Sequence, residues 1–399
     1  MKSASLYLFN GRDASGRPVS LRVEAGRIAD PLPRDGDRHV DLRGGRLLPG
    51  LINAHDHLQL NALPRLKYRA SYEHASQWSE DIDPRRASDA LLLANAAVPR
   101  AQRLLIGGIK NLLSGVTTVA HHDPFDEELA APGFPVRVPS RYGWAHSLAL
   151  QGEAAVRASQ RQTPPEQPWI IHAAEGIGAA AAEEFDRLDG LGCVGANTVL
   201  VHGLALDAAQ QRRLNQAGGG LVWCPGSNLH LFGRTLGAEA LSRQTRLALG
   251  SDSRISGERD LLAELALARE CVGWSEARLE ALVTGRAAAL LGLRDRGGLA
   301  CGQLADVLVL PPGLALSQAT RADVRLVLVG GEPRYADPDL LEELGAIDRL
   351  MPVRVDGHAK LLDAELVTTL RAAAVQEPGL DLLHHHHHHH HHRLPESVS

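Results

Sequence analysis

Two histidines separated by a single residue, His55 and His57, follow directly on the apolar stretch 51–54. In a β-strand, residues i and i+2 point to the same face, so the two imidazoles would project together. Imidazole nitrogen is a preferred ligand of zinc and iron. The pair therefore predicts half of a metal site at the end of a strand, although two such histidines also fit an ordinary polar surface.

Further polar side chains follow other short apolar runs, and each alone is compatible with a loop residue. In a barrel of parallel strands, all carboxyl ends open on the same face, so residues far apart in sequence can converge there. The repetition of the pattern favours one shared site. Its members are His121 and His122 after the run 116–120, His172 after 169–171, His202 after 198–201, and Asp252 after 247–251.

The elements that would position these side chains alternate between short apolar runs and alanine- and leucine-rich helical segments over residues 48–298. This pattern predicts an α/β fold in which parallel strands close into a (β/α)8 TIM-type barrel, with an open doubly wound sheet as the alternative. Between Arg137 and Trp169 there is room for one strand and one helix only. We therefore expect the third and fourth units of the barrel to be compressed.

The two ends of the chain have a different texture. Residues 1–47 and 299–335 contain short alternating runs, which predict a small flanking β-sandwich built from both segments. Residues 336–383 are expected to form a helical extension. Residues 384–399 include a run of nine histidines, His384 to His392, and lack the apolar content of a core. We predict that this tail is disordered and has no catalytic role.

The overall composition excludes several classes of protein. The 42 basic and 47 acidic residues give a net charge of −5, so no basic surplus points to nucleic acid. No long apolar run suggests a membrane span or a signal peptide. The four cysteines are widely spaced and form no CxxC pair. We expect a cytoplasmic protein with reduced thiols that binds neither nucleic acid nor membrane.

Six motifs in order carry a resemblance that covers roughly residues 15–335. They are PGLINAHDHL (49–58), HAAE (172–175), VHG (201–203), CPGSNLHL (224–231), LGSDS (249–253) and GQLADVLVL (302–310). With these motifs the chain resembles the amidohydrolase superfamily, in the branch of cytosine and guanine deaminases, S-adenosylhomocysteine deaminase and triazine hydrolases. The resemblance implies a metal-bearing barrel with a flanking β-sandwich, a small-molecule substrate and a homodimer.

The chemistry of these residue types and the resemblance together assign roles. The metal ligands are His55, His57, His172 and Asp252, which would hold one divalent cation, zinc in the first place and iron as the alternative. Asp252 would also accept the proton of a metal-activated water. Glu175 would carry a proton to the substrate, unless it only caps a helix N-terminus. His202 would polarise the substrate.

The lysines restrict the metal count. In relatives with two metals, a carbamylated lysine from the middle of the barrel bridges the ions. This chain has no lysine between Lys110 and Lys360. The lysine-bridged design is therefore excluded and one metal is favoured, while a glutamate bridge stays open.

Three further residues are candidates for substrate binding, each with a simpler alternative. Asn228 would shape the pocket wall or form a turn. His121, or its neighbour His122, would contact the substrate or lie on a polar surface. Arg65, with the nearby cations Lys67 and Arg69, would bind an anionic group or belong to a solvated loop.

The sequence therefore predicts a metal-dependent hydrolase of a non-peptide C–N bond. The favoured reaction is the deamination of an aminated heterocycle. The alternative is hydrolysis of an amide or cyclic amide at the same metal centre. A more remote alternative is a non-catalytic metal-binding barrel.

Overall fold

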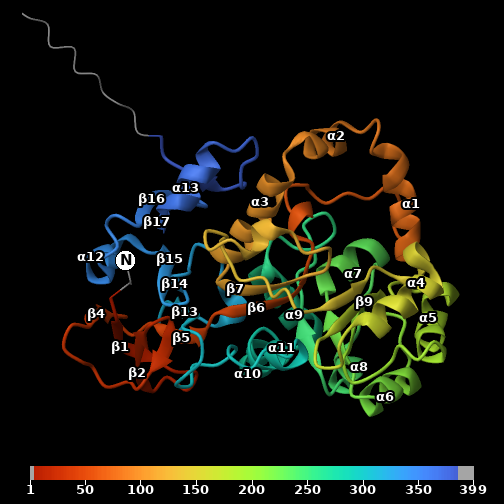
Figure 1. Ribbon diagram of the computed structural model, residues 1–399, viewed down its shortest axis with the longest axis horizontal. Helices are drawn as coiled ribbons and strands as arrows, with labels where there is room; N and C mark the ends of the chain where they lie inside the picture. The colour runs from red at the N-terminus through yellow and green to blue at the C-terminus, as the bar shows by residue number, and fades with distance from the viewer. Residues whose placement is uncertain (1–3, 385–399) are drawn as a thin grey trace, which may run out of the picture.

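The computed structural model describes residues 4–384 of the chain (Figure 1). Within these residues, the strands form one sheet of eleven strands, one of five and one of two. The strands of the two smaller sheets are parallel, and those of the large sheet are mostly antiparallel. The α/β prediction, with parallel strands beside a β-rich part, is confirmed.

The five-stranded sheet has the order β12-β11-β10-β9-β8, and β6 pairs with β7. These strands are β6 (Leu51–Asp56), β7 (Val116–His121), β8 (Gly143–Ala145), β9 (Trp169–Ala173), β10 (Thr198–His202), β11 (Gly220–Trp223) and β12 (Leu247–Leu249). The helices between and after them are η1 (Leu58–Leu60), α1 (Ala75–Arg85), α2 (Ala90–Ala97), α3 (Arg100–Leu113), η2 (Glu127–Ala130), α4 (Leu148–Gln162), α5 (Ala179–Gly190), α6 (Ala208–Gln216), α7 (Pro225–Phe232), α8 (Ala238–Ser242), α9 (Leu261–Val272), α10 (Glu276–Ala281) and α11 (Gly285–Leu290).

The segment 282–283 joins the two parallel sheets on one side. Its carbonyl oxygens accept hydrogen bonds from Ile52 of β6 at 2.8 Å and from Leu249 of β12 at 3.0 Å. Nearer the carboxyl ends, the backbone N–H of Asp252 donates to the carbonyl oxygen of His55 at 3.0 Å. These bonds fix the ends of β6 and β12 beside each other, where two of the predicted ligand-bearing segments lie.

On the other side, the wall of parallel strands is reduced. Arg137 pairs with Thr118 of β7 through a single parallel bridge, and the next strand, β8, has only three residues. The predicted compression of the third and fourth units corresponds to this bridge and this short strand.

The parallel strands are buried on both faces, which explains why they have continuous apolar runs and no alternation. One face contributes to a buried cluster that includes Ile52, Ile170, Val201 and Ala248. The other face packs against the surrounding helices, as Ile171 and Leu200 do. Burial of both faces makes the strands a rigid support for the side chains at their ends.

The eleven-stranded sheet combines strands from both ends of the chain. Its order is β18-β16-β17-β15-β14-β13-β5-β1-β2-β3, and β4 pairs with β1. The N-terminal strands are β1 (Leu6–Arg12), β2 (Pro18–Glu24), β3 (Arg27–Ala29), β4 (Arg38–Asp41) and β5 (Arg46–Pro49). The C-terminal part consists of β13 (Val307–Leu310), η3 (Leu316–Gln318), β14 (Leu326–Val329), β15 (Glu332–Ala336), η4 (Pro338–Leu340), α12 (Leu341–Leu344), β16 (Leu350–Val355), β17 (His358–Asp363), α13 (Ala364–Arg371) and β18 (Leu380–Asp381).

The helical extension predicted for residues 336–383 differs from the structure. This segment contains three strands of the large sheet, and its longest helix is α13. The missed signal is Asp356-Gly357 between two runs of β character, since both residues have positive φ, at 51° and 82°, as a tight hairpin turn requires. The β-rich part therefore extends from β13 through β18.

The predicted disordered tail at 384–399 lies, apart from His384, outside the described residues. Among the helices of residues 4–384, none has both the length and the apolar character that a membrane span needs.

Candidate metal centre

Imidazoles and one carboxylate gather at the carboxyl ends of the parallel strands, as the sequence pattern predicts. Two groups of possible ligands overlap at His55, and within each group the ligand atoms lie within 4.8 Å of one another. The first contains His55, His57, His122 and His172, and the second contains His55, His202 and Asp252. The four predicted ligands are thus divided between the two groups.

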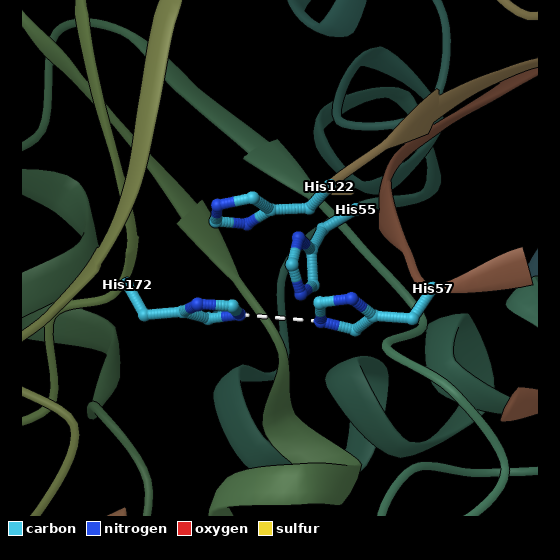
Figure 2. Close-up of side chains that lie close together, drawn as sticks. All are labelled: His55, His57, His122 and His172. Atoms are coloured by element: carbon cyan, nitrogen blue, oxygen red, sulfur yellow. Dashed lines mark hydrogen bonds between the residues drawn. The ribbon is translucent and has the colours of Figure 1, made fainter. Parts of the chain in front are cut away.

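The distances between the possible ligand atoms are those expected when their lone pairs point to one common centre. The Nε2 atoms of His57 and His172 lie 3.3 Å apart, as the dashed line in Figure 2 marks. Oδ1 of Asp252 lies 3.6 Å from Nε2 of His55 and 3.8 Å from Nε2 of His57. Tetrahedral ligands of zinc with bonds of about 2.0–2.1 Å are themselves separated by about 3.4 Å. The spacing of these atoms therefore fits a small cation between them.

Hydrogen bonds on the far side of the rings orient two of these nitrogens. Nδ1 of His57 donates to Oδ2 of Asp123 at 2.8 Å, and Nδ1 of His172 donates to the carbonyl oxygen of His146 at 2.8 Å. In a neutral ring, donation through Nδ1 leaves the lone pair on Nε2, which is the atom that faces the cluster. Asp123 thus acts behind His57, a role that the sequence reasoning did not assign.

The charges around the cluster also favour a cation. Although burial opposes it, the negative charge of Asp123 raises the pKa of His57 to about 9, so without a metal Nε2 of this ring holds a proton, and a cation bound there would take the place of that proton. Burial lowers the pKa of His55 and holds that of His172 well below its usual range. These rings are therefore neutral, and each can offer a lone pair to a cation. Both ring nitrogens of His55 are buried without a hydrogen-bond partner. A divalent cation would satisfy this orphaned histidine, so the residues present fit a metal.

The sequence did not decide whether His121 or His122 faces the site. In the structure, His122 is the one that belongs to the cluster. Its ring stacks on that of His172 with centroids 4.1 Å apart. Its Nε2 donates to the carbonyl oxygen of Ala145 at 2.8 Å, which leaves Nδ1 as the buried atom with a lone pair. The preceding residue, His121, instead accepts a hydrogen bond at Nδ1 from the backbone N–H of Leu58 at 3.3 Å. The strand geometry therefore turns His122 toward the cluster.

Glu175 and His202 form a second pair beside Asp252. Nε2 of His202 lies 3.2 Å from Oε1 of Glu175 and 3.7 Å from Oδ2 of Asp252. Burial and the negative charge of Asp252 hold the pKa of Glu175 well above its usual range, whereas burial lowers the pKa of His202 to about 4. Nδ1 of His202 donates to Oδ1 of Asn228 at 3.1 Å, so Nε2 carries the lone pair. A protonated Glu175 therefore faces an acceptor nitrogen.

The backbone at these strand ends is strained. His202 has φ of 78° and Asp252 has φ of 52°, values that a non-glycine residue seldom adopts. Such conformations persist only where surrounding contacts hold them, and they concentrate at functional sites. The strain at the two residues agrees with the placement of a site here.

Lys110 of α3 supports the cluster from behind. Its buried ammonium lies within 3.1 Å of Asp56, Asn61, Ser251 and the carbonyl oxygen of Asp252. Asp56 lies between the two ligand histidines in sequence, and Asp252 follows β12. One ammonium group thus connects the two strand ends that supply ligands, which is a contribution that no sequence motif suggested.

No family model matches the chain. The 8-oxoguanine deaminase of Pseudomonas aeruginosa is 25% identical, over 84% of this chain and 92% of that protein. A 5-methylthioadenosine/S-adenosylhomocysteine deaminase of Haloarcula marismortui is 25% identical, over 71% and 77%. A zinc-bound adenosine deaminase structure from Xanthomonas campestris aligns with a TM-score of 0.67 at 22% identity, covering 86% of this chain and 96% of that one. These similarities agree with the resemblance to the amidohydrolase superfamily that the sequence motifs carry.

Another member of this structural group is the atrazine chlorohydrolase of Arthrobacter aurescens in complex with zinc and atraton. It aligns with a TM-score of 0.68 at 17% identity and covers 86% of this chain and 98% of that one. Two of these neighbouring structures contain zinc. The fold of this chain is thus similar to that of these two zinc-containing proteins.

The candidate metal pocket is the cavity of about 360 Å³ that His57, His172, Glu175 and Asp252 line. Asn228, a predicted substrate-binding residue, is fully buried and holds His202. Arg65 does not belong to the lining of the metal pocket, since its guanidinium binds the carbonyl oxygen of Gly257 and the carboxylate of Glu258. The assignments of His121, Arg65 and Asn228 to substrate binding stay predictions.

Proposed function

We propose that this protein is a metal-dependent hydrolase that deaminates an aminated heterocycle. The observation that carries the proposal is the convergence of imidazole nitrogens and Asp252 beside the pair formed by Glu175 and His202. The relatives named above support it, because they are deaminases of 8-oxoguanine and of adenine-containing nucleosides. Hydrolysis of an amide at the same centre is the alternative, and no observation in the structure favours it.

The proposed ligands are His55, His57, His172 and Asp252, and the proposed cofactor is one zinc ion, with iron(II) as the alternative. A cation bound here would act as a Lewis acid and lower the pKa of water. His122 is a further candidate ligand because it belongs to the same group as His55 and its Nδ1 is buried without a hydrogen-bond partner. The proposal also includes a homodimer and a cytoplasmic location, which rest on the resemblance and on the cysteine pattern.

The residues of the chain itself would move the protons. The pKa of Asp252 is well below its usual range, because the nearby imidazoles of His55, His57 and His202 outweigh the effect of burial. It is therefore a carboxylate that can accept a proton at Oδ2. Glu175 holds a proton that it can deliver to a ring nitrogen, which makes the ring carbon more electrophilic. A proton can return to Glu175 by way of His202, because Nε2 of His202 can accept a proton.

The proposal is tested by loading the protein with zinc, after removal of bound metal, and measuring ammonia release from aminated purines, pterins, pyrimidines and triazines. We expect ammonia from at least one ring. Glu175→Gln should lower kcat by about 100-fold or more, the range of general acid–base catalysis. His55→Ala should lower bound zinc and activity together. Glu183→Gln is the matched control, because Glu183 lies exposed on α5.

The outcomes separate the alternatives. A new carboxylate without ammonia would replace deamination by amide hydrolysis. Bound zinc without turnover of any compound in either assay would favour the non-catalytic barrel. A zinc content that is near zero in both the wild type and His55→Ala would remove the metal centre itself.

A further inference from the structure

A second cavity lies directly beside the metal pocket. It has a volume of about 410 Å³ and lies against α1 and α2, and we call it the side chamber. Trp78, His146 and Ile255 line both cavities. The side chamber therefore adjoins the place where a substrate would meet the metal ligands.

The wall of the side chamber is mainly apolar. Its side chains include Leu63, Ile82, Leu92 and Leu150 in addition to the shared Trp78. The indole N–H of Trp78 already donates to the carbonyl oxygen of Leu66 at 2.8 Å, so the ring presents apolar surface. Pockets with this lining bind apolar groups, and the volume lies in the range typical of small-molecule sites.

Three guanidinium groups belong to the lining of the metal pocket, and two of them already have acidic partners. Arg86 pairs with Asp83 at 3.1 Å, and Arg100 pairs with Asp126 at 2.8 Å. Arg103 lines both cavities, as Arg86 does, but its polar contacts differ from those of the other two. Its Nε donates to the carbonyl oxygen of Val98, and among the described residues no carboxylate forms an ion pair with it.

The position of Arg103 leaves its charge uncompensated. Burial lowers its pKa, and the positive charge of the neighbouring Arg100 adds to this effect. A guanidinium group in a partly buried place without a counter-ion is a binding site for a carboxylate, which it can hold through two parallel hydrogen bonds. One uncompensated charge matches one negative charge on a ligand.

We propose that the heterocyclic substrate carries an apolar substituent that occupies the side chamber and ends in a single carboxylate bound by Arg103. This inference rests on the proposed function for the position of the ring. It deepens that function by excluding a bare base as the best substrate. The cations that the sequence suggested for an anionic group, around Arg65, are replaced in this role by a residue of α3.

The test measures binding to the zinc-loaded protein by calorimetry, with three adenine compounds. They are 9-methyladenine, 9-pentyladenine and 9-(carboxybutyl)adenine. We expect the pentyl compound to bind more tightly than the methyl compound, because its chain fills the side chamber. The carboxylate should then add about tenfold or more, as a hydrogen-bonded charge pair does. The same order is expected for kcat/KM if ammonia is released.

Two variants with matched controls locate the effect. Arg103→Gln should remove the advantage of the carboxylate and leave binding of the pentyl compound unchanged, while Arg161→Gln, at the exposed end of α4, should change neither. Ala96→Trp should fill the side chamber and weaken the two long compounds without affecting 9-methyladenine. Ala94→Trp is its control, because Ala94 is exposed on the same helix and outside the lining.

Binding and turnover give separate answers. Equal affinities of the pentyl and carboxybutyl compounds, or a carboxylate preference that persists in Arg103→Gln, would overturn this inference even if ammonia is released from other rings. Absence of ammonia from every compound would instead contradict the proposed function, while the order of affinities would still decide the role of Arg103.

Discussion

Two buried cations, one in each half of the molecule, illustrate how similar electrostatics can serve different ends. Lys110 lies among the parallel strands, and Arg321 lies beside the large sheet, where it binds Asp356 and Glu377. Both side chains are 1% exposed or less. Lys110 donates a hydrogen bond to the carbonyl oxygen of Asp252, whereas Arg321 donates to residues of the C-terminal part. Burial alone therefore does not distinguish a residue that supports the site from one that supports only the fold.

The strongest test of this comparison removes the buried ammonium. Lys110→Met should lower the free energy of unfolding by about 3–5 kcal/mol, because Asp56 then keeps a buried charge without its partner. Zinc affinity should fall as well, because the link between β6 and the Asp252 segment is lost. Urea unfolding and competitive zinc titration measure the two effects. The double variant Lys110→Met/Asp56→Asn should recover part of the stability, and no recovery would argue against the charge as the cause.

The corresponding change in the other half should affect stability alone. Arg321→Met leaves Asp356 and Glu377 without the guanidinium, and we expect a loss of similar or slightly smaller size, about 3 kcal/mol. Asp356 is partly exposed, and Glu377 keeps its second ion pair with Arg254 at 2.8 Å. Zinc affinity should stay at the wild-type value. A drop in zinc affinity of the Arg321 variant, measured on folded protein, would mean that the two halves are coupled.

A smaller change affects the metal centre without the core. Asp123→Asn keeps the volume of the side chain but removes the charge behind His57, and we expect zinc affinity to fall about 10- to 100-fold. The metal-free protein should also lose some stability, because the Asp123 carboxylate there accepts hydrogen bonds from His57 and Gln59, so zinc affinity is measured on folded protein. The Asp126→Asn variant, which removes a carboxylate paired with Arg100, controls for loss of charge in the same loop. Equal effects of both variants would refute a specific role of Asp123.

The smallest expected effect lies in the hairpin of the large sheet. Gly357 has φ of 82° and open space around its α-carbon, so Gly357→Ala costs only the strain of the left-handed conformation, about 1 kcal/mol. Thermal unfolding should show this loss with unchanged zinc binding. Gly190→Ala, at the end of α5 with open space around it, serves as the control and should not destabilise the protein.

The sequence predicted the convergence of the candidate ligands better than it predicted the structure of the C-terminal part. His55, His57, His172 and Asp252 each follow an apolar run, and the common face of parallel strand ends made their convergence predictable. The segment after residue 336 was interpreted as helical, although Asp356-Gly357 indicates a hairpin. There the strands belong to one sheet formed from both ends of the chain, so their pairing partners are distant in sequence.

The sequence by itself determined which residue types stand at the strand ends, and hence the kind of chemistry, because strand geometry places residues i and i+2 on one face. Only the tertiary structure decided that His122 and not His121 turns toward the cluster, that Asp123 orients His57, and that Lys110 joins two strand ends. It also decided that Arg103 is left without an acidic partner among the described residues while Arg65 has one. These outcomes depend on which side chains meet across elements, and spacing along the chain carries no information about such contacts.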